Sequence, residues 1–419
     1  MFKKLSNNKI INPFNTKDLN LETIYSYLII SFIFVSIFII IPSDRSSIGI
    51  SSVILDIGDR IFYISESGND YGYSDYSGNI LYPYILKTIS FFTGLIGKDQ
   101  YSKLWNLIII LITSSLSIIS LRFLRLATLN MFNQKVSNIA SILYMINPYT
   151  YFYSLSGGIT NFLIIGVSFT LYLFSKKTKL VNNNNLNGNL YIILVCAYLS
   201  FLRPSGGIFG FIILLFLLWE VLKTIIHQQV FGNREVINTV FIILGLTIVS
   251  YNISSTLDYS FGTVKLFANE GGQFFGYPRD YLRERLTIQS NSLITNFKNT
   301  LYFLMWKITD FVSGLSDIRD THSQVANEGK VLPFMARTFT GIFILFPINL
   351  FSFLGIVTNL KFILKSQIGI VLLSAFVAIC PSLIGISMSR YLMMFYPPFL
   401  VFSAKMIHDT FLGIRESKI

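Results

Sequence analysis

Charged residues are scarce in this sequence. Asp, Glu, Lys and Arg together make up 13% of the 419 residues, while hydrophobic residues make up 52%. A soluble domain of this size typically carries about 25% charged residues. The composition therefore excludes an ordinary soluble domain and predicts an all-α, polytopic membrane protein whose apolar helices face lipid.

Cysteine and histidine are also rare, and several kinds of site are excluded with them. Cys196 and Cys380 lie within apolar runs, which argues against a disulfide framework or a thiolate metal site. Neither GxxxxGK(S/T) nor GxGxxG occurs, so no nucleotide-binding phosphate loop is predicted. The net charge of +12 comes from dispersed bases without a nucleic-acid-binding module, and nucleic acid is not expected as a partner.

Long apolar stretches alternate with polar segments along the chain. A crossing needs about 20 apolar residues, and this length predicts about ten transmembrane helices within residues 23–407. Two apolar stretches are each too long for a single crossing. We expect a break near residues 154–158 in one of them and a tight turn at Arg203 in the other. A single span over residues 190–221 is the alternative. The remaining predicted spans cover residues 23–42, 104–121, 236–254, 335–357, 367–386 and 391–407.

The distribution of charge predicts how the chain is oriented. We place residues 1–22 and 408–419 in the cytoplasm. Lys and Arg then strongly outnumber Asp and Glu in the inner segments, which include a basic turn at Arg122 and Arg125. The outer segments are nearly balanced, as the positive-inside rule describes. The sequence thus predicts a multi-pass protein of the cytoplasmic (inner) membrane with both termini inside.

Two long polar loops, residues 43–103 and 255–332, then fall on the outer side. The first contains Asp56 and Asp59, followed by Tyr63, and on a helix these three side chains share one face. Ionisable groups beside a membrane mark function more often than packing. We therefore expect Asp59, with Asp56 in reserve, to act as a catalytic carboxylate. The alternative is a solvated loop whose acidic residues keep it soluble.

Both outer loops also contain segments that are expected to lie on the membrane. Residues 81–97 are apolar but interrupted by Lys87, which suits a helix in the interface. In the second loop, an amphipathic run precedes a charged cluster for which substrate contact and a plain charged loop are the two main interpretations. Convergence of part of this cluster on a divalent metal ion is a third. The cluster contains Asp317, Arg319, Asp320 and His322.

Five short motifs add a resemblance to a known family. They are Gly58-Asp59 followed by Tyr63, LYPYILK from Leu81, NPYTYFYSLSGG from Asn147, RPSGG from Arg203 and SRYLMMFYPP from Ser389. In this order they resemble the GT-C class of integral-membrane glycosyltransferases, and among these the bacterial mannosyltransferases and aminoarabinose transferases that use polyprenyl-phosphate sugars. The resemblance covers about residues 20–405.

Two positions depart from the pattern of that class. Asp59-Arg60 stands where many members have Asp-Glu, which leaves open whether Asp59 or Asp56 is the catalytic carboxylate. Asn161 stands where many members have Glu after the NP turn, which weakens a second acidic role.

The resemblance implies an inverting transfer of a sugar from a polyprenyl-phosphate donor to a lipid-linked or cell-surface glycan acceptor. A carboxylate of the first outer loop would be the general base, and no cofactor is implied with certainty. Arg203 and Arg390, each alone at the outer end of a span, would bind the donor phosphate; the alternative is that they extend to lipid head groups. Tyr63 and Tyr82 would contact substrate. A surface-polysaccharide polymerase or ligase, and a lipid-linked oligosaccharide flippase or other transporter, are the alternative functions.

Overall fold

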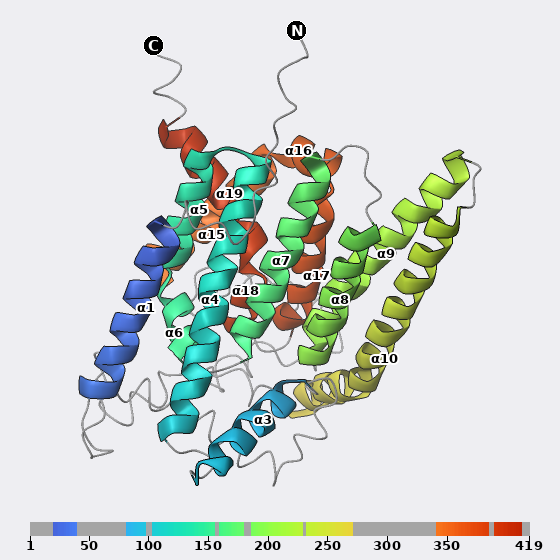
Figure 1. The fold of residues 1–419 in the computed structure, drawn as a ribbon. Coiled ribbons are helices and arrows are strands. Elements are labelled where there is room, and N and C mark those ends of the chain that lie inside the picture. Colours follow the sequence, from blue (N-terminus) through green and yellow to red (C-terminus); the bar gives the residue numbers. More distant parts are fainter. Residues whose placement is uncertain are drawn as a thin grey trace, which may run out of the picture.

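The structure of the protein is a computed structural model (Figure 1). Every regular element in the described residues is a helix, and this part of the chain contains no strand. The predicted all-α class is therefore confirmed there. The structure describes residues 20–39, 81–97, 103–155, 159–179, 186–228, 232–270, 341–384 and 389–412.

The helices follow one another with short connections over most of the described chain. In the first half they are α1 (Asn20–Ile39), α3 (Leu81–Leu95), α4 (Lys103–Met131), α5 (Gln134–Ile146), α6 (Pro148–Leu155), α7 (Thr160–Lys179), α8 (Leu186–Leu202), α9 (Pro204–Gln228) and α10 (Asn233–Glu270). In the second half they are the π-helical turn η3 (Gly341–Leu345), α15 (Phe346–Thr358), α16 (Leu360–Lys365), α17 (Ile368–Ile384), α18 (Ser389–Met394), α19 (Tyr396–Ile407) and the π-helical turn η4 (His408–Leu412).

Several helices have the length and composition of membrane spans. Within the described residues, four stretches are long and apolar enough to cross a bilayer, namely Leu107–Met131, Pro204–Ile226, Glu235–Ser254 and Gly341–Thr358. Further apolar helices are shorter, among them Thr160–Lys176 and Ile368–Cys380. The protein is therefore a helical membrane protein.

The centre of the bundle is α7. It packs against α4, α8, α17, α18 and α19. Side chains around α7 are inaccessible to solvent, including Leu163, Val167, Leu171 and Phe174. A helix that is apolar or small on all sides can be enclosed in this way. Figure 1 shows the start of α1 and the end of η4 toward one end of the bundle, which we call the η4 end, and α3 at the opposite end.

Glycines allow several helices to approach each other closely. A Cβ atom on Gly206 of α9 would overlap the carbonyl oxygen of Leu199 in α8, and one on Gly210 would lie 3.0 Å from Cys196 Cβ. A Cβ atom on Gly355 of α15 would likewise meet the carbonyl oxygen of Phe402 in α19. Small residues at such contacts are typical of helix packing in membranes, because dispersion and not the hydrophobic effect holds the helices together.

The helix α3 has the two faces expected of a helix in the interface. Its buried residues, Tyr82, Leu86, Ile89 and Thr93, recur every three or four positions and so line one face. This helix contacts α4 and α8. The opposite face exposes Tyr84, Phe91, Phe92 and Leu95. Aromatic residues of this kind are enriched at membrane–water boundaries.

Both predicted interruptions of the long apolar stretches are confirmed. The helix α6 ends at Leu155 and α7 begins at Thr160. Arg203 is the one residue between α8 and α9, so that residues 190–221 form two helices and not one. Pro204 explains the second break, since a proline opens a helix well but disfavours helical geometry in the residue before it.

Other expectations at the helix ends are wrong. Arg122 and Arg125 were predicted in a basic turn, but they lie inside α4, which continues to Met131. The span expected to end at Ser254 continues as α10 to Glu270. Its 38 residues correspond to about 57 Å, well beyond the roughly 30 Å of a hydrocarbon core. Hydropathy marks where a helix leaves the apolar layer, which need not be where its backbone hydrogen bonds end.

Candidate functional site

Three of the apolar segments are interrupted at a single residue. These residues are Asn147 between α5 and α6, Arg203 between α8 and α9, and Phe395 between α18 and α19. A proline follows directly in the first two cases and two residues later in the third. Asn147 accordingly adopts an extended backbone, with φ −73° and ψ 110°. Asn147 and Phe395 are fully buried, so these interruptions lie inside the bundle.

The three interruptions come together in space. The side-chain amide of Asn147 donates a hydrogen bond to Met393 Sδ at 3.4 Å, and the Arg203 guanidinium donates one to Met394 Sδ at 3.6 Å. The ring of Phe395 lies 5.7 Å from that of Phe209, in the second turn of α9. Figure 1 shows α6, α18 and the α8–α9 turn away from the η4 end. We call this region the break cluster.

Side chains satisfy the backbone groups around the Asn147 turn. Asn147 Oδ1 accepts a hydrogen bond from the Tyr149 N–H at 3.0 Å, and Thr150 Oγ1 donates to the carbonyl oxygens of Asn147 at 2.6 Å and Tyr144 at 3.1 Å. Irregular backbone at membrane depth requires such partners, because lipid offers none. The turn is therefore held in one geometry by its own side chains.

A second set of hydrogen bonds ties the end of α6 to its neighbours. Thr113 Oγ1 in α4 donates to the carbonyl oxygen of Ser154 at 2.6 Å. Asn161, at the start of α7, donates to the carbonyl oxygen of Thr113 at 3.0 Å and to Ser154 Oγ at 3.1 Å. A single buried amide thus links α4, α6 and α7.

Some buried polar atoms at the break cluster have no hydrogen-bond partner among the described residues. They are Asn161 Oδ1, Ser205 Oγ and the Tyr396 hydroxyl. Buried polar atoms nearly always pair with protein or ordered water. Ser205 Oγ, two residues after Arg203, and the Tyr396 hydroxyl, next to Phe395, could form hydrogen bonds with water or with the hydroxyl groups of a bound molecule.

Two of the predicted site residues have described side chains, Arg203 and Tyr82. Arg203 lies in the break cluster, partly buried. Tyr82 is buried in α3, with its ring 5.8 Å from that of Phe162 in α7. The carbonyl oxygen of Phe162 accepts a hydrogen bond from the Tyr198 hydroxyl at 2.9 Å, five residues before Arg203. Both predicted residues therefore lie around the start of α7.

The side chains of the other predicted site residues are not described by the structure. Arg390 lies in α18, one turn before Met394, but its side chain is outside the description. The remainder lie wholly outside the described residues, namely Asp56, Asp59, Tyr63, Asp317, Arg319, Asp320 and His322.

The carboxylates whose side chains the structure describes lie away from the break cluster. Glu22, Glu220, Glu235 and Asp409 are all in helix segments toward the η4 end of the bundle. Partial burial raises the pKa of Asp409, but hydrogen bonds from Lys405 and His408 outweigh this and hold that pKa below its usual value. None of these four carboxylates is therefore placed to serve the break cluster.

Metal binding finds no support in the described ranges. They contain no group of three or more His, Cys, Asp or Glu side chains that could hold a metal ion. Binding of a divalent metal ion was one interpretation of the cluster of Asp317, Asp320 and His322. This cluster lies outside the described ranges.

Sequence reasoning missed several residues of the break cluster. The contacts of Met393 and Met394 were not predicted, because a methionine in an apolar stretch is expected to face lipid or to pack in the core. Asn161 was noted only as a departure from a family pattern, although an amide in an uncharged 39-residue stretch is itself a sign of helix–helix hydrogen bonding. Ser205 follows Arg203-Pro204 directly and was not singled out.

Comparison with known proteins adds no name. Neither the protein-family models nor the curated proteins give a match to this chain.

Proposed function

We propose that this protein is a GT-C-type glycosyltransferase that moves a sugar from a polyprenyl-phosphate donor to a lipid-linked or cell-surface glycan acceptor. The observation that carries the proposal is the convergence of three interrupted helical segments, one of them interrupted at Arg203, away from the η4 end of the bundle. Non-helical backbone at this depth is tolerated where it is buried in protein or lines a cavity. An arginine at such a place is suited to hold a phosphate through its fork of N–H donors.

The proposed topology has ten crossings. They are α1, α4, α5–α6, α7, α8, α9, α10, η3–α15, α17 and α18–α19. An even number of crossings agrees with the start of α1 and the end of α19 lying toward the same end of the bundle, the η4 end (Figure 1). With the positive-inside rule, that end is cytoplasmic and the break cluster lies nearer the outer face.

The proposed chemistry is a single displacement at the anomeric carbon of the sugar. The acceptor hydroxyl or amine attacks this carbon as its bond to the phosphate oxygen breaks, so that the configuration inverts. The acceptor proton passes to a carboxylate, which must lie within hydrogen-bond reach of the attacking atom. The electron pair of the broken bond stays with the polyprenyl phosphate, whose developing charge Arg203 stabilises.

The general base in this proposal is Asp59, with Asp56 in reserve, from the first outer loop. This assignment draws on the sequence pattern, since both residues lie outside the described ranges. The helix α3 supports it indirectly. It begins at Leu81, within this loop and after Asp59 along the chain, and packs through Tyr82 against the start of α7.

The role of Arg203 can be tested by sugar transfer in membrane vesicles with labelled polyprenyl-phosphate sugars. We expect Arg203→Gln to lower the rate by about 100-fold, the loss typical of removing one group that stabilises the transition-state charge. Arg203→Lys should keep part of the activity, because a point charge replaces the fork. Lys361→Gln, which removes an exposed cation from α16, is the matched control and should transfer normally.

Other outcomes would decide between the alternatives. Full activity of Arg203→Gln would contradict the phosphate role. Movement of an intact lipid-linked sugar across the membrane, without transfer, would favour the flippase or transporter. A ladder of products that grows by whole repeat units would favour the polymerase.

A further inference from the structure

The short helix α16 connects two apolar helices at the η4 end of the bundle (Figure 1). The apolar stretch Gly341–Thr358 ends directly before it, and the apolar helix α17 begins at Ile368. Apolar stretches of this kind end where the hydrocarbon layer ends. The six residues of α16, Leu360–Lys365, therefore lie at the boundary of that layer.

One side of α16 is fixed to the bundle. Ile363 is only 5% exposed, and a Cβ atom on Gly369 of α17 would overlap its carbonyl oxygen. The ring of Phe362 lies 5.4 Å from that of Phe132, which directly follows α4. The N–H of Ser366 donates a hydrogen bond to the carbonyl oxygen of Phe362 at 3.0 Å, where the helix ends. These contacts leave the other side of α16 pointing away from the bundle.

The outward side of α16 carries apolar and basic side chains next to each other. Leu364 is 77% exposed and Leu360 is 49% exposed. Lys361 and Lys365, one helical turn apart, are exposed as well. Residues 341–384 contain no other charged residue, so neither α15 nor α17 supplies a carboxylate to these lysines. A leucine beside a lysine at the membrane boundary matches the acyl chains and the phosphate of a lipid.

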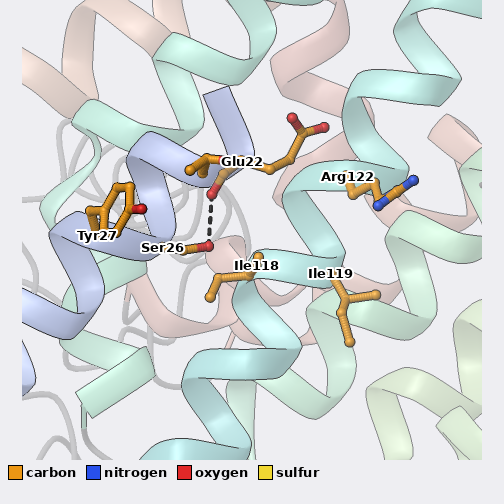
Figure 2. A pocket seen from close by; sticks show the side chains of 7 residues that line it. Glu22, Ser26, Tyr27, Ile118, Ile119 and Arg122 are labelled. Atoms are coloured by element: carbon orange, nitrogen blue, oxygen red, sulfur yellow. Dashed lines mark hydrogen bonds between the residues drawn. The ribbon is translucent and has the colours of Figure 1, made fainter. Parts of the chain in front are cut away.

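Other cations toward the η4 end are paired with carboxylates. Arg125 donates a hydrogen bond to Glu22 Oε2 at 2.6 Å. Figure 2 shows Glu22 at the cleft between α1 and α4, with Arg122 extending from the facing helix. Lys405 is paired with Asp409, also at 2.6 Å. Opposite charges thus neutralise each other at these places, which leaves α16 as the better candidate for attraction to an anionic surface.

One carboxylate of a neighbouring helix approaches the chain just after α16. Glu220 of α9 accepts a hydrogen bond from Gln367 Nε2 at 3.2 Å, two residues after Lys365. Even with this negative charge counted, Lys361 and Lys365 leave one net positive charge there.

We propose that α16 is a docking surface for anionic phospholipid, with lipid phosphates at Lys361 and Lys365 and acyl chains against Leu360 and Leu364. Basic residues immediately beside a membrane span attract anionic head groups, and each such residue adds to the attraction. A soluble anion would match the lysines alone, whereas a phospholipid matches the exposed leucines as well. Because Arg203 lies away from the η4 end, this surface is separate from the proposed donor site and the inference does not rest on sugar transfer.

The test is lipid binding to the purified full-length protein in detergent, measured by native mass spectrometry. Phosphatidylglycerol and phosphatidylcholine with the same acyl chains are titrated separately. We expect the wild type to bind phosphatidylglycerol about tenfold more tightly, and the double variant Lys361→Gln with Lys365→Gln to lose most of this preference. Lys87→Glu changes the net charge by the same two units at an exposed position of α3, at the opposite end, and should keep the preference.

A further variant tests the apolar part of the surface. Leu364→Gln removes the most exposed leucine of α16 and keeps both lysines, and we expect it to weaken phosphatidylglycerol binding. Binding as tight as in the wild type would overturn the acyl-chain contact. A preference that survives the double lysine variant would overturn the phosphate contact. Equal loss in Lys87→Glu would also overturn the proposal, because it would show attraction to net charge alone.

Discussion

At the scale of single residues, the polar groups inside the bundle are concentrated where helices are interrupted or meet. Asn147, Thr150 and Asn161 bond backbone carbonyls or neighbouring side chains in and around the α5–α6 turn. Each is fully buried. In an apolar environment such hydrogen bonds hold the local backbone in one geometry, because a geometry that broke them would leave a buried polar group without a partner. They fix the shape of the break cluster that presents Arg203.

The buried Glu22–Arg125 pair allows a direct test of this reasoning at the other end of the bundle. Arg125→Met should lower the free energy of unfolding by about 3 kcal/mol, because it leaves the Glu22 carboxylate buried without its cation. The double variant Glu22→Leu with Arg125→Met should recover much of that loss. Thermal unfolding in detergent measures both.

An exposed ion pair provides the control for that cycle. Lys405 and Asp409 are paired at 2.6 Å on the last turn of the described chain, with Asp409 45% exposed. Asp409→Asn should cost less than about 1 kcal/mol, since water screens the pair. If Arg125→Met proved as mild as Asp409→Asn, the Glu22–Arg125 pair would not be what holds α1 against α4.

At the scale of helices, close approach depends on glycine. Gly206 lies three residues after Arg203, where α9 leaves the break cluster and presses against the carbonyl of Leu199 in α8. A side chain at this position must push the two helices apart. Because Arg203 joins these helices, its guanidinium would move with them.

We therefore expect Gly206→Ala to lower both stability and transfer. Overpacking of this kind costs about 1–3 kcal/mol, and transfer should fall further than stability explains. The matched control is Gly94→Ala in α3, where a new Cβ atom would meet nothing within 4 Å. Unfolding temperature and the rate of transfer from a polyprenyl-phosphate sugar are the two measurements. Wild-type behaviour of Gly206→Ala would contradict the close packing of α8 and α9.

The helix boundaries show what the sequence could and could not predict. The break at Arg203 was predictable because Pro204 has a local steric effect on the residue before it. The extensions of α4 past Arg122 and of α10 past Ser254 were not, since charge and hydropathy report the environment of a helix and not its hydrogen bonds.

The candidate site was predictable only in part for a related reason. Arg203 was found as an isolated charge in an apolar stretch. Its partner Met394 is 191 positions away, and Asn147 and Met393 are 246 positions apart. Periodicity and motifs describe neighbours along the chain, so they cannot bring such residues together. That information comes from the packing of the whole bundle.

At the scale of the whole molecule, the account requires a defined orientation. Lys87 in α3 and Lys361 in α16 are both exposed and lie toward opposite ends of the bundle (Figure 1). In cells whose outer face is accessible, a membrane-impermeant maleimide should label Lys87→Cys and not Lys361→Cys. Permeabilised cells should show both. Labelling of Lys361→Cys alone in intact cells would reverse the proposed orientation and place the break cluster toward the cytoplasm.

The proposed function is sugar transfer from a polyprenyl-phosphate donor with a carboxylate of the first outer loop as base. The most direct measurement is transfer from labelled donors in membrane vesicles that contain the wild type, Asp59→Asn or Asp56→Asn at equal protein levels. The amide keeps the size of the side chain but cannot accept the proton. The account predicts transfer by the wild type and by Asp56→Asn, and its loss in Asp59→Asn. No transfer by the wild type from any such donor, or full activity of both variants, would contradict it.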